Sequence, residues 1–245
     1  MGAGLELVEE LARDAARLGV ETGLPFIAAS ADIGSPEPMV GLDGRPLAET
    51  IFQWVDPALE YWRDRGFALR SPFVHAARFS AEPFYYHDRR FGSWRPAPWI
   101  ETFGRVETPD TFGVGAAIIA PAYHPRGVIG AIVWASPDAD VDVKAVFDAK
   151  AGLFHATALK LTGAYQDVRR SIRPEPARLT RREIQCLKWA AAGKTDMEIG
   201  TIVRISTPTV RFHITNAAGK LGVGGRSQAV LRAANLGYIG AAAAG

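Results

Sequence analysis

The chain has 245 residues, of which 48% are hydrophobic and 10% aromatic. This composition is typical of a folded globular protein and excludes wholesale disorder. No apolar run approaches the roughly 18 residues of a membrane span, and Glu6, Glu9 and Glu10 lie where a signal peptide needs an uncharged core, so we expect a cytoplasmic location. The one cysteine, Cys186, excludes an internal disulfide and most cysteine-based metal sites, and we expect no cofactor.

Charge is distributed unevenly along the chain. From Glu175 to the end there are ten Lys and Arg against four Asp and Glu, a net charge of +6, whereas the preceding residues carry eighteen against twenty-two, a net charge of −4. A small basic segment joined to a mildly acidic one favours a polyanion-binding module beside a separate sensing or assembly module. The alternative is a chance fluctuation of charge on solvated surfaces.

The first part of the chain predicts helices and strands in alternation with turns. Apolar residues at helical spacing over 5–18 predict an amphipathic helix, and the apolar run 26–33 predicts a buried strand. The Pro- and Gly-rich stretch 35–46 predicts turns. Prolines placed to open helices predict one helix over 57–65 and another over 72–80.

A hairpin and a long helix follow. Two apolar stretches, 112–120 and 127–135, flank the turn-forming segment 123–126 and predict an antiparallel hairpin. Helical spacing over 141–170 predicts a long helix. Because the strands are grouped between helices without repeated βαβ alternation, the sequence predicts an α+β sandwich.

A linker is predicted over 171–178. Pro174 and Pro176 disfavour helix at the residues before them, so the long helix should stop here. The linker would separate a ligand-binding and dimerisation domain over 1–170 from a small helical domain over 179–245.

The small domain carries two capping boxes, Thr180-Arg-Arg-Glu183 and Thr195-Asp-Met-Glu198, each of which marks a helix start. The first helix is predicted to end near Ala192 and the second near Ile202. Ser206 is placed to cap a third helix, and 226–236 predicts a fourth. Four short helices form a small bundle, and the second and third are spaced as a helix-turn-helix.

In a helix-turn-helix the recognition helix enters the major groove of DNA. Arg211 and Thr215 lie one helical turn apart on that helix, and an arginine can donate two hydrogen bonds to guanine. The neighbouring residues suited to phosphate contacts are Thr207, Thr209, His213 and Lys220. The alternative is that these polar side chains only solvate a surface helix.

A resemblance decides between these interpretations. The segments Leu179–Glu183, Ala192–Thr195, Thr209–His213, Lys220–Val223 and Ser227–Val230 closely resemble the LuxR-type helix-turn-helix signature, in the same order. The resemblance implies that Arg211, Phe212 and Thr215 face bases, and that the fourth helix helps dimerisation. It also implies that Lys194, Thr209, His213 and Lys220 lie near the DNA backbone. A two-fold homodimer would read a pseudo-palindromic site in double-stranded DNA.

The first domain resembles the autoinducer-binding domain of quorum-sensing LuxR-type regulators. The resemblance is carried by Ala58–Phe67, Ser71-Pro72, Pro83–Tyr86, Phe112-Gly113 and Arg126-Gly127. The resemblance implies an α/β/α sandwich, in which an antiparallel sheet lies between helices, with an acyl-homoserine lactone buried on one side of the sheet. The candidate ligand-binding residues at and beside the family's positions are Trp54, Ala58, Trp62, Ser71, Tyr86 and Ala117.

Several of these residues depart from the family. Ala58 stands where the family has a Trp that donates to the lactone carbonyl, and Ser71 where it has an Asp that accepts the ligand amide N–H. Trp62 stands at a Tyr position, Tyr86 at a Trp position and Ala117 at a Gly position. Leaving both ligand groups under-satisfied would cost roughly 1–3 kcal/mol each. We therefore expect a small-molecule ligand other than an ordinary acyl-homoserine lactone, as in the relatives called LuxR solos.

Three alternatives stay open for this domain: an ordinary acyl-homoserine lactone receptor, a ligand-independent regulator with a filled pocket, and an aromatic core without a ligand site. The aromatic residues that would line a pocket for a planar ligand, or build that core, are Trp54, Tyr61, Trp62, Phe84, Tyr85, Tyr86, Trp94 and Trp99. An enzyme is not expected, because His87 and Asp88 would point to opposite faces of a strand and no Gly-x-Ser-x-Gly elbow occurs.

Overall fold

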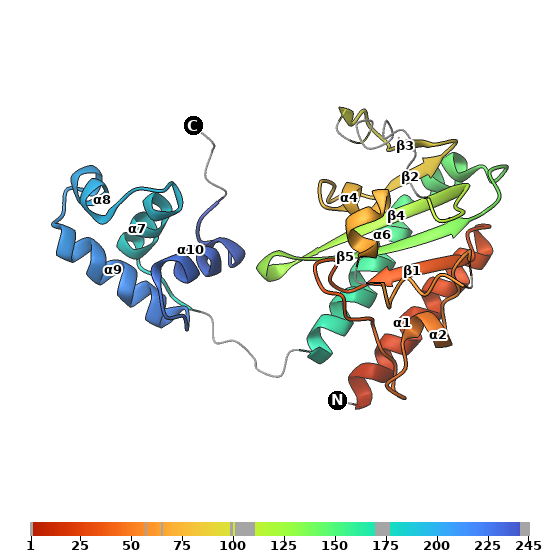
Figure 1. Cartoon of the computed structure of the whole chain (residues 1–245), viewed down its shortest axis with the longest axis horizontal. Coiled ribbons are helices and arrows are strands. Elements are labelled where there is room, and N and C mark those ends of the chain that lie inside the picture. Colours follow the sequence, from red (N-terminus) through yellow and green to blue (C-terminus); the bar gives the residue numbers. More distant parts are fainter. Residues whose placement is uncertain are drawn as a thin grey trace. The chain divides into compact units, whose positions relative to one another are not determined.

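The computed structural model describes residues 2–56, 58–64, 66–98, 100, 111–169 and 177–240. The chain forms two compact units, a larger one made of Met1–His124 and Val128–Ser171 and a smaller one made chiefly of Ile172–Gly245 (Figure 1). Most of the predicted linker lies outside the described residues, and the predicted domain boundaries stay a proposal. Each unit is described by itself.

A five-stranded antiparallel sheet forms the centre of the first unit. Its strands are β1 (Phe26–Ser30), β2 (Phe84–His87), β3 (Arg90–Gly92), β4 (Ala116–His124) and β5 (Val128–Ser136), in the order β1-β5-β4-β2-β3. β4 and β5 pair from end to end, which confirms the predicted hairpin. The predicted connection over 123–126 is displaced, because β4 continues through His124 and the chain reverses at Pro125–Gly127, where Arg126 has a φ of 74°.

Two long helices cover one face of this sheet. They are α1 (Gly2–Glu21) and α6 (Val143–Arg169), which lie against each other and against the strands (Figure 1). Trp134 of β5 is fully buried in the core between them and packs edge-on against Phe154. Its indole nitrogen donates to the carbonyl oxygen of Ala15 at 2.9 Å, so the buried polar group is satisfied. Both predicted helices are confirmed.

Short helices cover the opposite face. α3 (Phe67–Arg70) and α4 (Pro72–Ala77) supply Phe67 and Phe73 to a second apolar core, which they share with Phe84 and other residues of the sheet. Helices therefore lie on both sides of an antiparallel sheet, as the predicted α/β/α sandwich requires.

The helix predicted over 57–65 is wrong. Pro57 and Arg65 lie outside the described residues, and 58–64 form turns. The carboxylates of Asp56 and Asp64 each accept a hydrogen bond from the backbone two residues on, at 2.9 Å from Ala58 N–H and 2.8 Å from Gly66 N–H. Such local side-chain bonds offer the backbone an alternative to a helix.

Other boundaries differ by a few residues. The predicted helix over 72–80 ends at Ala77, because Ser80 closes a turn with Glu82. The predicted strand over 26–33 ends at Ser30, ahead of a turn in which Asp32 accepts from the Gly34 N–H. The four-residue helix α2 (Leu47–Thr50) lies beyond what the periodicity of the sequence can predict.

The second unit is a bundle of α7 (Arg181–Ala191), α8 (Asp196–Val203), α9 (Thr207–Lys220) and α10 (Arg226–Asn235) around one apolar core. All of these helices are predicted by the sequence, and both capping boxes are closed by reciprocal hydrogen bonds. Ser206 caps α9 by accepting from the Thr209 N–H. Across the described part of the chain, no helix is long and apolar enough to cross a membrane.

Candidate functional site

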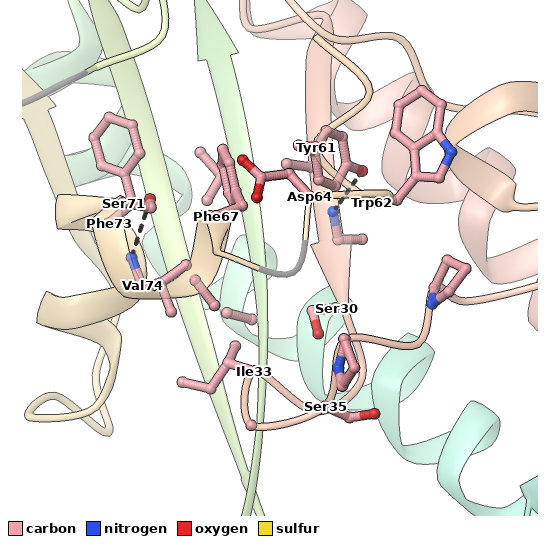
Figure 2. Close-up of a pocket in the computed structure, with 18 of the residues that line it drawn as sticks. Ser30, Ile33, Ser35, Tyr61, Trp62, Asp64, Phe67, Ser71, Phe73 and Val74 are labelled. Carbon is pink, nitrogen blue, oxygen red and sulfur yellow. Dashed lines mark hydrogen bonds between the residues drawn. The ribbon is translucent and has the colours of Figure 1, made fainter.

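The first unit contains a cavity of about 350 Å³ on the side of the sheet that carries α3 and α4 (Figure 2). This volume lies within the range of small-molecule sites. The apolar part of its wall includes Ala28, Ile33, Phe67, Phe73, Val74, Ala131 and Val133. Polar groups are contributed by Ser30, Ser35, Glu37, Trp54, Tyr61, Trp62, Asp64, Ser71 and Arg78. A cavity of this size disfavours the alternative in which aromatic side chains fill the space.

Three of the predicted ligand residues, Trp54, Trp62 and Ser71, line this cavity. The other three do not. Ala58 is exposed in the turn closed by Asp56. Tyr86 and Ala117 pair with each other across β2 and β4 and are buried in the apolar core beneath Phe73 and Phe91. The alignment with the family placed these three residues by sequence order, but turns and strand packing keep them off the wall of the cavity.

The two tryptophans bring hydrogen-bond donors that have no acceptor. Trp54 is 5% exposed, and the indole nitrogens of both Trp54 and Trp62 are screened from solvent and unpartnered among the described residues. An unsatisfied buried donor costs about 1–3 kcal/mol, so such groups in a native fold require an explanation. Because protein atoms cover both nitrogens, neither donor is open to the cavity in this structure.

Two hydroxyl groups of the wall are already engaged as acceptors. The Ser71 hydroxyl caps α4, with 3.5 Å between its oxygen and the Val74 nitrogen. The Tyr61 hydroxyl oxygen accepts from the Ala29 N–H at 3.3 Å. Burial raises the pKa of Tyr61 far above its usual 10.0, against the lowering effect of the Ala29 hydrogen bond, so this phenol stays neutral.

Asp64 is a wall residue that the sequence did not indicate. Its side chain is 35% exposed, and its carboxylate accepts from the Gly66 N–H and forms an ion pair with Arg70. In Figure 2 the carboxylate lies between Phe67 and Tyr61, with Ser71 on one side and Trp62 on the other. The helix predicted for this stretch would have set Asp64 on a solvated face, which is why it was missed.

The predicted aromatic cluster is divided among several places. Trp54, Tyr61 and Trp62 line the cavity, and Phe84 and Tyr86 are core residues on the same side of the sheet. The remaining members lie elsewhere: Tyr85 packs against Phe147, Trp94 is 68% exposed and donates to Glu82, and Trp99 lies outside the described residues. Both interpretations of the cluster, pocket and core, therefore hold for different members.

The second candidate site is the exposed side of α9. Arg211, Phe212 and Thr215 are exposed there, with 75% of the Arg211 side chain and 60% of Phe212 accessible. The flanking Thr207, Thr209 and His213 are half-buried. A three-residue turn joins α8 to α9, and Arg204 takes up a left-handed conformation in it with a φ of 58°. This arrangement is a helix-turn-helix whose second helix presents its N-terminal half to solvent.

Two of the basic residues that are predicted to contact DNA form ion pairs with acidic side chains. Arg211 Nε lies 3.5 Å from the Asp196 carboxylate, which also binds Arg226. Lys194 lies 3.7 Å from Glu198.

Lys220 has a structural partner that the sequence did not indicate. Its ammonium group donates to both oxygens of Glu183, at 2.8 and 2.9 Å, and Glu183 is only 3% exposed. Burial alone would raise the pKa of Glu183, but hydrogen bonds from Lys220 and Thr180 outweigh it and leave the pKa below its usual value. Because 40% of the Lys220 side chain remains exposed, its contact with the DNA backbone stays a prediction.

The chain thus combines a helix-turn-helix bundle, whose second helix is exposed, with a cavity-bearing α/β/α unit. Residues 177–233 match the model of the bacterial regulatory proteins, luxR family. Residues 177–233 therefore form a helix-turn-helix domain of the luxR type.

Two transcription regulators are similar in sequence to more than half of this chain. It is 35% identical to the transcriptional activator protein VanR of Vibrio anguillarum, over 60% of this chain and 62% of VanR. It is 29% identical to the quorum sensing-dependent regulator RpaR of Rhodopseudomonas palustris, over 84% of this chain and 80% of RpaR. The structural alignment with SdiA in complex with octanoyl-rac-glycerol covers 94% of this chain and 88% of the SdiA chain, with 18% sequence identity and a TM-score of 0.49. The chain thus spans about three fifths of VanR, and the named curated relatives are transcription regulators rather than enzymes.

Proposed function

We propose that this chain is a cytoplasmic, homodimeric transcription regulator that binds a pseudo-palindromic DNA site through α9 and a small molecule through the cavity of its first unit. The observation that carries the DNA-binding part is the luxR-family match over 177–233, together with the exposure of Arg211, Phe212 and Thr215 on α9. The net charge of +6 from Glu175 onward supports a polyanionic partner.

The ligand is proposed to differ from an ordinary acyl-homoserine lactone. Ala58 offers no side-chain donor and is exposed, and the Ser71 oxygen is engaged in capping α4. The two anchors that the family uses for lactone and amide are therefore both missing from the wall. Such a molecule would change DNA binding only through its different affinities for the free and DNA-binding states.

Replacing Arg211 with Ala should lower the affinity for a specific DNA site by about tenfold, or about 1.4 kcal/mol, because the bidentate contact to guanine is lost. The site would first be selected from a random DNA library with the wild-type protein. Affinity for the selected site and for base-substituted sites would then be measured by fluorescence anisotropy. Arg178→Ala removes one exposed positive charge from the same unit and is the matched control. If Arg211→Ala discriminates between sites as the wild type does, Arg211 does not read bases.

The ligand-binding part is tested by repeating the titration with compounds present. We expect affinity for the selected site to change with a non-lactone aromatic compound and to stay the same across a panel of acyl-homoserine lactones. Unchanged affinity with every compound would indicate a ligand-independent regulator. A response to lactones alone would indicate an ordinary autoinducer receptor.

A further inference from the structure

We propose that Asp64 is a hydrogen-bond acceptor for the ligand of the cavity, and that the ligand is a small molecule with an apolar body and a polar end that carries an N–H or O–H donor. This inference rests on the proposed role of the cavity as a ligand site. It assigns to Asp64 the role of an ionised acceptor, whereas Ser71 offers a neutral hydroxyl that already caps α4.

The choice of Asp64 follows from the acceptors that the wall provides. Two carboxylates occur among the described lining residues, Asp64 and Glu37. The Glu37 side chain is 59% exposed and forms an ion pair with Arg169. The Asp64 side chain is 35% exposed, so it is the better shielded of the two. Shielding from water strengthens a hydrogen bond to an ionised group.

Asp64 also has acceptor capacity to spare. An ionised carboxylate provides about four acceptor positions. The Gly66 N–H and the Arg70 guanidinium occupy part of this capacity, one on each oxygen. These two contacts fix the carboxylate in the position seen in Figure 2, between Phe67 and Tyr61.

The chemistry of the ligand follows from the whole wall. Asp64 provides an anionic hydrogen-bond acceptor on this wall. A complementary molecule carries an N–H or O–H group for Asp64, and a primary amide is one such group. The apolar side chains of the wall and the volume of about 350 Å³ set the size and character of the rest.

Two related amides test the proposal directly. Cinnamamide and N,N-dimethylcinnamamide share a planar apolar body and a carbonyl oxygen, but only the first has N–H donors. Binding of each to the full chain would be measured by calorimetry and by tryptophan fluorescence. We expect the wild type to bind cinnamamide about tenfold more tightly than its dimethyl derivative, and Asp64→Ala to reduce this preference to less than threefold.

A matched control is available in the same stretch of chain. Asp56 closes a turn of the same kind as Asp64 but is exposed and does not line the cavity, so Asp56→Ala should keep the wild-type preference. Asp64→Asn retains an acceptor for the Gly66 N–H and should give an intermediate preference without loss of the turn. A preference that persists in Asp64→Ala, or a wild type that binds neither amide, would overturn the proposal. DNA binding by the same proteins without amide separates this result from a failure of the regulatory function.

Discussion

Replacing Lys220 with Met should lower the free energy of unfolding of the C-terminal unit by about 2–3 kcal/mol. The change removes the ammonium group that pairs with Glu183 and leaves a carboxylate that is 3% exposed with only its hydrogen bonds to Thr180. Removing one partner of a buried ion pair costs about 3–5 kcal/mol, and the partial exposure of Lys220 reduces that figure here. Thermal and urea unfolding followed by circular dichroism would measure the loss.

Lys194→Met is the matched control, because Lys194 pairs with Glu198 at the surface. Exposed pairs contribute about 0–1 kcal/mol, so this variant should unfold close to the wild type. The double variant Glu183→Gln, Lys220→Met removes both charges and should recover most of the loss. Equal effects of the two lysine substitutions would contradict the assignment of the Glu183–Lys220 pair as a buried support.

The same pair predicts a dependence on pH. Because the pKa of Glu183 is lowered in the folded protein, its contribution to stability is present above the usual value of 4.5. The contribution is lost as the pH falls below that value and through the lowered pKa. Stability of the wild type should therefore fall more steeply in acid than that of Glu183→Gln. Parallel curves for the two proteins below pH 4.5 would contradict this.

Replacing Gly200 with Val should destabilise the helix-turn-helix by about 3 kcal/mol and weaken DNA binding with it. A Cβ atom at Gly200 would lie 2.8 Å from the backbone carbonyl oxygen of Ile205, in the turn between α8 and α9. The Ile205 N–H also donates to the Gly200 carbonyl oxygen at 3.0 Å, so the turn folds tightly back on α8. Backbone at this distance cannot give way as a flexible side chain can, and overpacking of this kind costs about 1–3 kcal/mol or more.

Gly219→Val provides the matched control within the same unit. Gly219 lies on the exposed side of α9, and a Cβ atom there meets nothing within 4 Å. The same substitution should change stability by less than about 0.5 kcal/mol, because valine is at least as good a helix former as glycine. The midpoints of thermal or urea unfolding would be compared, and Gly200→Val should unfold at the lower one. Similar midpoints for the two variants would show that the turn accommodates a side chain at Gly200.

The bundle was predictable from sequence because its signals are local. Thr180 and Glu183 satisfy each other's backbone across one turn of helix, so their spacing alone marks the start of α7. The bond between Glu183 and Lys220 joins residues 37 positions apart. No periodicity connects such residues, and only the packing of α7 against α9 brings them together.

The cavity was predicted less completely for a related reason. The resemblance to the family pointed to Trp62, which lines the cavity, and to Ala58, which lies exposed in a turn. The carboxylates of Asp56 and Asp64 set the path of this stretch through hydrogen bonds to the backbone. A pattern of hydrophobic residues does not report such bonds, so the sequence predicted a helix here and gave no sign of Asp64 in the wall.

The carboxylate shared between α7 and α9 also limits how this domain can evolve. Glu183 serves both the backbone at Thr180 and the ammonium group of Lys220, so a change at any one of these positions alters which residues are acceptable at the other two. A lineage that loses the lysine is left with an uncompensated charge until position 183 changes as well. Positions 180, 183 and 220 should therefore change together among descendants of this chain, whereas the exposed positions 211 and 215 are not subject to this constraint.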